Sequence, residues 1–158
     1  MSSFFGSSSS APSAAQYAPL IKVTLGYVFL YYSFIIYQAV TVFRALAAHK
    51  RAGKKFVRYY NAADMAVLTA DRTVGNFLEQ AFPFLVTLWL HGVFCGDVAR
   101  TACAGWTYVA ARALYPFCYG AGQQSDKPIV KPKAPIFLST LPCYAVIAFF
   151  AYELYASL

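Results

Sequence analysis

Charged side chains are scarce in this chain of 158 residues. Only 12% of the residues are Asp, Glu, Lys or Arg, whereas about 25% is usual for soluble domains. Hydrophobic types make up 59% of the chain, against roughly 45–50% in an average soluble domain. A water-soluble fold needs charge on its surface, and a disordered chain needs more still. The composition therefore excludes a disordered chain, argues against a soluble domain, and indicates a protein that places its apolar surface in a lipid bilayer.

The chain also lacks the cysteine patterns of metal and disulfide sites. Its four cysteines all lie in apolar stretches, with no CxxC pair and no Cys/His cluster. We therefore expect neither a metal site nor a disulfide framework. Buried free cysteines behave as small hydrophobic residues, which is the interpretation favoured here. The cysteines are Cys95, Cys103, Cys118 and Cys143.

The first sixteen residues, MSSFFGSSSSAPSAAQ, contain no charge. A cleavable signal peptide needs a basic segment before its apolar stretch, and a transit peptide needs arginines. Neither pattern is found here. We expect residues 1–17 to form a flexible, retained tail and residues 18–158 to form one membrane domain.

Four stretches are long and apolar enough to cross a bilayer, which requires about 20 residues of helix. Helices are expected because the backbone must satisfy its own hydrogen bonds in lipid. Pro135 lies near the start of the fourth stretch, and Pro142 predicts a kink within it. The second and third stretches are joined so closely that they must form an antiparallel hairpin. The prediction is an all-α integral membrane protein, a four-helix bundle with spans at residues 23–43, 73–96, 101–122 and 134–152.

The positive charges show a strong asymmetry. Ten lysines and arginines lie in the loops after the first and third spans, against Lys22 and Arg100 on the other side. The positive-inside tendency predicts that both loops are cytosolic (or matrix or stromal), with both termini across the membrane. A basic run could also bind nucleic acid, but its place between two spans favours topology and some attraction to anionic lipid. The ten are Arg44, Lys50, Arg51, Lys54, Lys55, Arg58, Arg72, Lys127, Lys131 and Lys133.

Ionisable side chains within membrane spans are costly and need an explanation. Arg72, Asn76 and Glu79 follow i, i+4, i+7 spacing and share one face of the second helix. Arg112, Tyr115 and Tyr119 share a face of the third in the same way. In one interpretation Arg112 and Glu79, at similar depth, form an ion pair that locks the packing. In the other, the two faces form a polar pocket open to the cytosol that holds a small anion.

His91 lies near the far end of the second span. We expect it to be a lone interfacial histidine with no further role.

The stretches DRTVGNFLEQAFPFLVTLWLHGVF and GWTYVAARALYPFCYG resemble the MAPEG family, the membrane-associated proteins of eicosanoid and glutathione metabolism. The resemblance is close over residues 72–120. It implies a trimer of four-helix bundles in the endoplasmic reticulum or another organelle membrane. It also implies glutathione as co-substrate, bound between neighbouring subunits near the cytosolic face. The implied glutathione-binding residues are Arg44, Arg72, Asn76, Glu79, Arg112, Tyr115 and Tyr119, with Tyr119 and Arg72 in catalytic roles.

The chain departs from the family pattern in three places. The usual glutamate–arginine pair upstream of the motif reads Leu68 and Thr69, and the tyrosine that often follows the glutamate is Gln80. Family members that conjugate lipid epoxides carry a thiol-activating arginine where this chain has Asp126, next to Lys127. A carboxylate at that position disfavours a thiolate.

Two functions follow from these observations. The first is a membrane-bound glutathione-dependent transferase or peroxidase that acts on lipophilic electrophiles. The second is a non-catalytic protein of the same fold, a scaffold or accessory subunit in a larger membrane assembly. Asp126, the replaced upstream pair and the uncharged tail favour the second function.

Overall fold

The computed structural model describes residues 14–58, 64–120 and 135–158, and every regular element within these ranges is a helix. The all-α prediction is therefore confirmed. Asp126 and Lys127 fall outside the described residues. The helices are α1 (Ala18–Arg51), α2 (Met65–Phe94), α3 (Val98–Ala113), α4 (Tyr115–Tyr119) and α5 (Ile136–Ala156).

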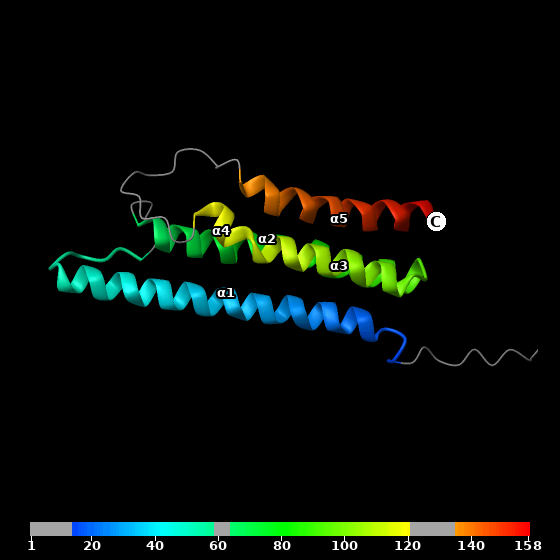
Figure 1. Cartoon of the computed structure of the whole chain (residues 1–158), viewed down its shortest axis with the longest axis horizontal. Helices are drawn as coiled ribbons and strands as arrows, with labels where there is room; N and C mark the ends of the chain where they lie inside the picture. The colour runs from blue at the N-terminus through cyan, green and yellow to red at the C-terminus, as the bar shows by residue number, and fades with distance from the viewer. Residues whose placement is uncertain (1–13, 59–63, 121–134) are drawn as a thin grey trace, which may run out of the picture.

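The long helices lie side by side in an elongated bundle, with successive helices running in opposite directions (Figure 1). The start of α1 and the end of α5 lie at one end of the bundle, together with the α2–α3 connection. The end of α1 and the start of α2 lie at the other end, with the basic residues that follow α1. The basic residues that follow α1 thus lie at the opposite end of the bundle from the start of α1 and the end of α5. The charge pattern predicts this separation.

Three helices in the described part of the chain, α1, α2 and α5, are long and apolar enough to cross a membrane. The third predicted span, residues 101–122, was expected to be one helix, and this expectation is wrong in one respect. The helix breaks at Leu114, between α3 and α4. Pro116 explains the break, because it has no N–H to donate to the carbonyl of Arg112 four residues earlier. Together α3 and α4 cover residues 98–119, which is about 30 Å of helix at 1.5 Å per residue.

A three-residue connection joins α2 to α3. Gly96 has a φ of 77°, a left-handed conformation that glycine adopts without a steric penalty. The Asp97 carboxylate then accepts a hydrogen bond from the Arg100 N–H at 2.8 Å and caps α3. Capping residues of this kind stabilise a helix start by about 1 kcal/mol. The predicted antiparallel hairpin is confirmed.

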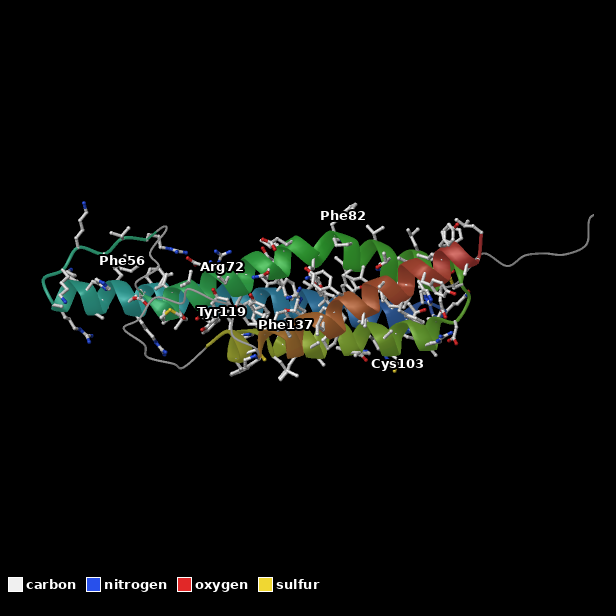
Figure 2. All side chains as sticks on the ribbon, turned by 90° about the horizontal axis from the view of Figure 1, so that it is seen from above. Phe56, Arg72, Phe82, Cys103, Tyr119 and Phe137 are labelled. Carbon is white, nitrogen blue, oxygen red and sulfur yellow. The ribbon has the colours of Figure 1, made fainter. Side chains whose placement is uncertain are left out.

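Aromatic rings fill the space between α1, α2 and α3. Phe84 and Tyr108 stack with their centroids 3.7 Å apart, and Tyr27 stacks on Phe77 at 4.3 Å. The outer surface is also apolar: Phe29 is 76% exposed and Phe82 77%, and Figure 2 shows Phe82 on the outside of the bundle. Large apolar side chains in such positions need lipid around them. The chain is a multi-pass integral membrane protein.

Candidate functional site

The hydroxyl of Tyr115 lies at the centre of the polar residues that the sequence singles out. The Asn76 side-chain amide donates to this hydroxyl at 2.6 Å and also to the carbonyl of Arg72 at 3.0 Å. Tyr119 stacks on Tyr115 with ring centroids 5.8 Å apart. The polar faces of α2 and of α3–α4 therefore meet, as the spacing predicts.

Arg112 lies beneath this contact and is 1% exposed. Its Nε and Nη2 atoms are fully buried, and neither has a hydrogen-bond partner among the described residues. The guanidinium carbon instead lies 5.8 Å from the ring centroid of Tyr108 and 5.7 Å from that of Tyr115. A buried cation with unused donors costs free energy unless an anion or another acceptor reaches it. An acceptor that reached Nε and Nη2 of Arg112 would therefore stabilise the folded protein.

Arg72 and Glu79 form the rim of the site. Both side chains are exposed, and both lie within electrostatic range of the Tyr115 hydroxyl, as Arg112 does. Figure 2 shows Arg72 and Tyr119 at the same level along the bundle, towards the end that carries the basic residues. The structure thus brings together six of the seven predicted residues: Arg72, Asn76, Glu79, Arg112, Tyr115 and Tyr119.

The predicted Arg112–Glu79 ion pair is wrong. The ion pairs of the described residues join Arg58 to Asp71, and Glu153 to both His91 and Arg100. Glu79 points to the outside of the single chain, while Arg112 points into the bundle. Counting residues along two antiparallel helices gives their relative depth but not the direction in which each side chain points.

Arg44, the seventh predicted residue, lies elsewhere. It lines a groove of about 350 Å³ between the end of α1 and the start of α2, together with Tyr37, Thr41 and Asp64. Within one chain it therefore does not join the residues around Tyr115.

Two buried residues, Gln80 and Tyr108, also belong to the surroundings of Arg112, although the sequence pattern did not assign them to the site. Gln80 is buried and accepts a hydrogen bond from the Tyr108 hydroxyl at 3.2 Å, while the Tyr108 ring lies next to Arg112. Tyr108 could have been found from spacing, because it precedes Arg112 by four residues on the same helix face. Gln80 could have been found in the same way, because it follows Asn76 by four residues on α2.

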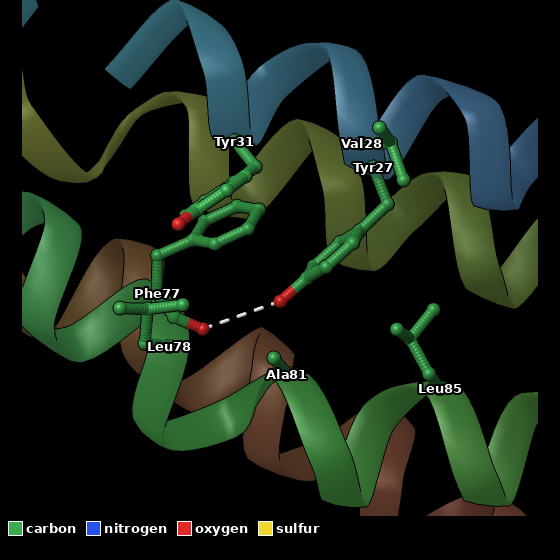
Figure 3. A pocket seen from close by; sticks show the side chains of 7 residues that line it. All are labelled: Tyr27, Val28, Tyr31, Phe77, Leu78, Ala81 and Leu85. Carbon is green, nitrogen blue, oxygen red and sulfur yellow. Dashed lines mark hydrogen bonds between the residues drawn. The ribbon is translucent and has the colours of Figure 1, made fainter. Parts of the chain in front are cut away.

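An apolar groove of about 120 Å³ opens between α1 and α2 (Figure 3). Tyr27, Tyr31 and Phe77 form its wall near the core, and the Tyr27 hydroxyl donates to the Phe77 carbonyl at 3.2 Å. Leu78, the residue before Glu79, lies at its margin and is half exposed. No charged group is among the residues that line this groove.

In chemical terms, the site offers a buried positive charge, two phenol groups, an amide, and one exposed residue of each charge. Arginines in such a set can bind carboxylates or other anions, and the exposed carboxylate can bind a cation.

The comparisons with known proteins agree with this geometry. The sequence model of the MAPEG family matches residues 24–152. No curated protein and no solved structure matches the chain. The matched stretch runs from α1 into α5 and contains all seven predicted site residues. With this match over most of its length, a multi-pass helical bundle and a polar site at the motif positions, the chain belongs to the MAPEG family.

Proposed function

We propose that the chain is a membrane-bound glutathione-dependent transferase or peroxidase that acts on lipophilic electrophiles. The observation that carries the proposal is Arg112, a buried guanidinium with two donors that no described residue satisfies. An anion bound at this position would remove the cost of the buried charge. The MAPEG family typically uses glutathione, whose thiolate or carboxylates could supply that anion.

Each group of glutathione has a partner type among the clustered residues. Arg72, at the exposed rim, can hold a carboxylate in bidentate fashion, and Glu79 can bind the ammonium group. Asn76 suits a peptide amide. Tyr119, whose ring stacks on Tyr115, can donate its hydroxyl to the sulfur, and the nearby positive charge of Arg112 favours the thiolate.

Catalysis in this scheme comes from position and charge. The site fixes glutathione in one pose and raises the fraction of thiolate, which is the nucleophile. An apolar electrophile can approach from the lipid, where the groove of Figure 3 provides an apolar surface next to Glu79. In a transferase reaction the thiolate forms a C–S bond to the electrophile while a leaving group departs or a strained ring opens. In a peroxidase reaction it attacks a hydroperoxide oxygen, the O–O bond breaks and the alcohol leaves, and a second glutathione then displaces water from the oxidised sulfur to form the disulfide.

We further propose that the protein works as a homotrimer. Arg44 lies in a separate groove of the single chain, so it can take part only if a neighbouring copy brings it to the site. The outward-pointing Glu79 is likewise placed where a neighbouring copy could cover it.

A second candidate function is a non-catalytic scaffold or accessory subunit of a larger membrane complex. Two sequence departures favour it. Asp126 occupies the position of the thiol-activating arginine. Gln80, in place of a tyrosine, is buried and bonded to Tyr108. In this case the site could still bind glutathione without ionising its thiol.

Calorimetric titration with glutathione, combined with the ultraviolet absorbance of the thiolate, separates the two functions. Arg72→Ala should weaken glutathione binding by roughly ten- to a hundredfold, because one charge-assisted hydrogen bond is worth about 1.5–3 kcal/mol. Arg51→Ala is the matched control, since Arg51 is an exposed arginine at the same end of the bundle. Tyr119→Phe should lower the thiolate signal more than the affinity. Binding without a thiolate would favour the accessory role, and no binding at millimolar glutathione would exclude the enzyme.

A further inference from the structure

A second polar cluster lies at the opposite end of the bundle, where α2, α3 and α5 meet. His91 is 0% exposed. Its Nδ1 lies 2.8 Å from the Thr101 hydroxyl, and its Nε2 lies 2.8 Å from one carboxylate oxygen of Glu153. Arg100 binds the other oxygen of Glu153, also at 2.8 Å. The expectation that His91 is a lone interfacial residue is wrong. We call His91, Thr101, Glu153 and Arg100 the termini-side cluster.

The hydrogens of this cluster can be assigned from its neighbours. The Thr101 oxygen lies 2.6 Å from the backbone carbonyl of Asp97. A carbonyl only accepts, so the single hydroxyl hydrogen of Thr101 must point to it. Thr101 therefore accepts from His91, which places a hydrogen on Nδ1. One position remains undecided, the 2.8 Å contact between Nε2 and the Glu153 carboxylate.

That contact also requires a hydrogen. Without one, the lone pair of Nε2 would face a carboxylate oxygen at 2.8 Å, which is repulsive. We propose that His91 and Glu153 hold one proton between them, and that this proton fastens α5 to the α2–α3 hairpin. The cluster is thus a proton-dependent latch at the end of the bundle that carries the chain termini. This inference is independent of the proposed glutathione chemistry.

The groups around the pair are one arginine, one capping carboxylate and two apolar rings. Arg100 lies against Glu153 with an Nη2–Oε1 distance of 2.8 Å, and its guanidinium carbon lies 4.8 Å from the centroid of the Phe149 ring. The Asp97 carboxylate caps α3 by accepting a hydrogen bond from the backbone N–H of Arg100. On α1, Leu20 packs towards Gly92, and the charged Lys22 is exposed. The rings of Phe149 and Phe150, 5.5 Å and 4.9 Å from the imidazole, limit access of water.

The direction of the pH effect follows from proton counting. Histidine in an unfolded chain loses its proton within the physiological pH range. In the proposed latch the folded protein keeps this proton where an unfolded histidine has lost it, so it binds one proton more than the unfolded chain. Its stability then falls as the pH rises, until the folded protein loses the proton too. Loss of the proton releases α5 from the hairpin at this end.

Glu153→Gln provides a sharp test, because glutamine can keep both contacts without any shared proton. Its amide group can donate to Nε2 of a neutral His91, while its oxygen still accepts from Arg100. We would measure the thermal unfolding midpoint of the full chain in detergent from about pH 5 to about pH 9, a range that brackets histidine titration. The wild-type midpoint should fall by several degrees towards high pH, and that of Glu153→Gln should fall by much less. Equal pH profiles for the two proteins would overturn the proposal.

A matched control and a direct readout cover the case in which a variant folds poorly. The chain has two histidines, and His49→Gln removes the other one, which contacts the Ala45 carbonyl on α1. This variant should keep the wild-type pH profile. In the same variant labelled with ¹⁵N-histidine, NMR should show His91 with a hydrogen on Nδ1 at every pH and a second proton at Nε2 that is lost at high pH. A ring with an unprotonated Nδ1 would refute the assignment.

Discussion

At the scale of single residues, the buried side chains of His91 and Arg112, near opposite ends of the bundle, differ in how many of their hydrogen-bonding atoms have partners. His91 has a partner for each ring nitrogen, whereas Arg112 has two donors without a partner among the described residues. A fully satisfied polar network stabilises a fold, whereas buried polar groups without partners lower its stability. Such destabilising groups persist where binding or catalysis requires them. This contrast is why we propose a structural role for His91 and a ligand-binding role for Arg112.

Arg112→Met tests this assignment at the residue that carries the proposed function. Burying an unpaired charge costs free energy, so an apolar side chain of similar length should be neutral or stabilising at this position. The ligand-free variant should therefore melt no lower than the wild type. The wild type should gain stability with glutathione, by about 2.7 kcal/mol at a hundred times Kd, and the variant should gain none. Thermal unfolding with and without glutathione measures both effects.

The same experiment decides whether an acidic partner was overlooked. If Arg112 were paired, its loss alone would strand a charge and cost about 3–5 kcal/mol. A large drop in the melting temperature of ligand-free Arg112→Met would contradict an open site. The double variant with Glu79→Leu should show no coupling energy within one chain, because no ion pair joins the two residues.

Residue spacing predicted which residues gather at the candidate site, but not all of the contacts among them. The i, i+4, i+7 pattern was enough to bring Asn76 onto Tyr115, because a helix face is fixed by its period. The Arg112–Glu79 pair failed because a period does not determine which way a long side chain extends from a shared face. His91 was underestimated for a related reason. Its partner Glu153 is 62 residues away, and no local pattern reports such a contact.

At the scale of helices, small residues determine how closely the elements approach. A Cβ atom on Gly105 of α3 would lie 2.8 Å from a methyl carbon of Val23 on α1 and 3.0 Å from one of Leu88 on α2. Both neighbours are fully buried. Membrane helices lack the hydrophobic driving force that water provides, so close packing at small residues is a main source of their association. Gly105 is therefore the point where three helices meet.

Gly105→Val should destabilise the bundle by about 1–3 kcal/mol, because overpacking forces the neighbouring side chains or helices to shift. Gly75→Val is the matched control, since nothing lies within 4 Å of a Cβ atom at Gly75 on α2. The control should be neutral or slightly stabilising, because glycine is a poor helix former. Thermal unfolding in one detergent compares the two variants. Equal losses would mean that the contact at Gly105 does not limit the packing.

The helices themselves could be predicted well from apolar runs, and their ends less well. The first predicted span covered residues 23–43, whereas α1 runs from Ala18 to Arg51. Hydropathy marks only the part of a helix that lies in lipid, so the polar continuation of α1 gives no such signal. The break at Leu114 was missed although Pro116 marks it, because the run of apolar residues continues through the proline.

At the scale of the whole molecule, the two polar sites lie at opposite ends of one bundle and therefore face different compartments. The candidate glutathione site lies towards the basic end, and the termini-side cluster lies with the end of α5. The charge asymmetry predicts that the basic end is cytosolic. In that orientation glutathione would reach the proposed site from the cytosol, and the proposed latch would respond to the pH on the other side of the membrane.

Labelling of single introduced cysteines tests this orientation. Lys54→Cys lies in the described basic segment after α1, and Ser157→Cys follows α5. Both are made in a chain whose Cys95, Cys103 and Cys118, the cysteines that are at least partly exposed, are replaced by serine. In sealed vesicles with the cytosolic face outward, a membrane-impermeant maleimide should label Lys54→Cys at once and Ser157→Cys only after permeabilisation. Labelling of both from one side would contradict the bundle as a set of membrane spans. The reverse pattern would keep the bundle, but it would place Arg72 and Arg112 away from cytosolic glutathione and so remove the supply on which the proposed function depends.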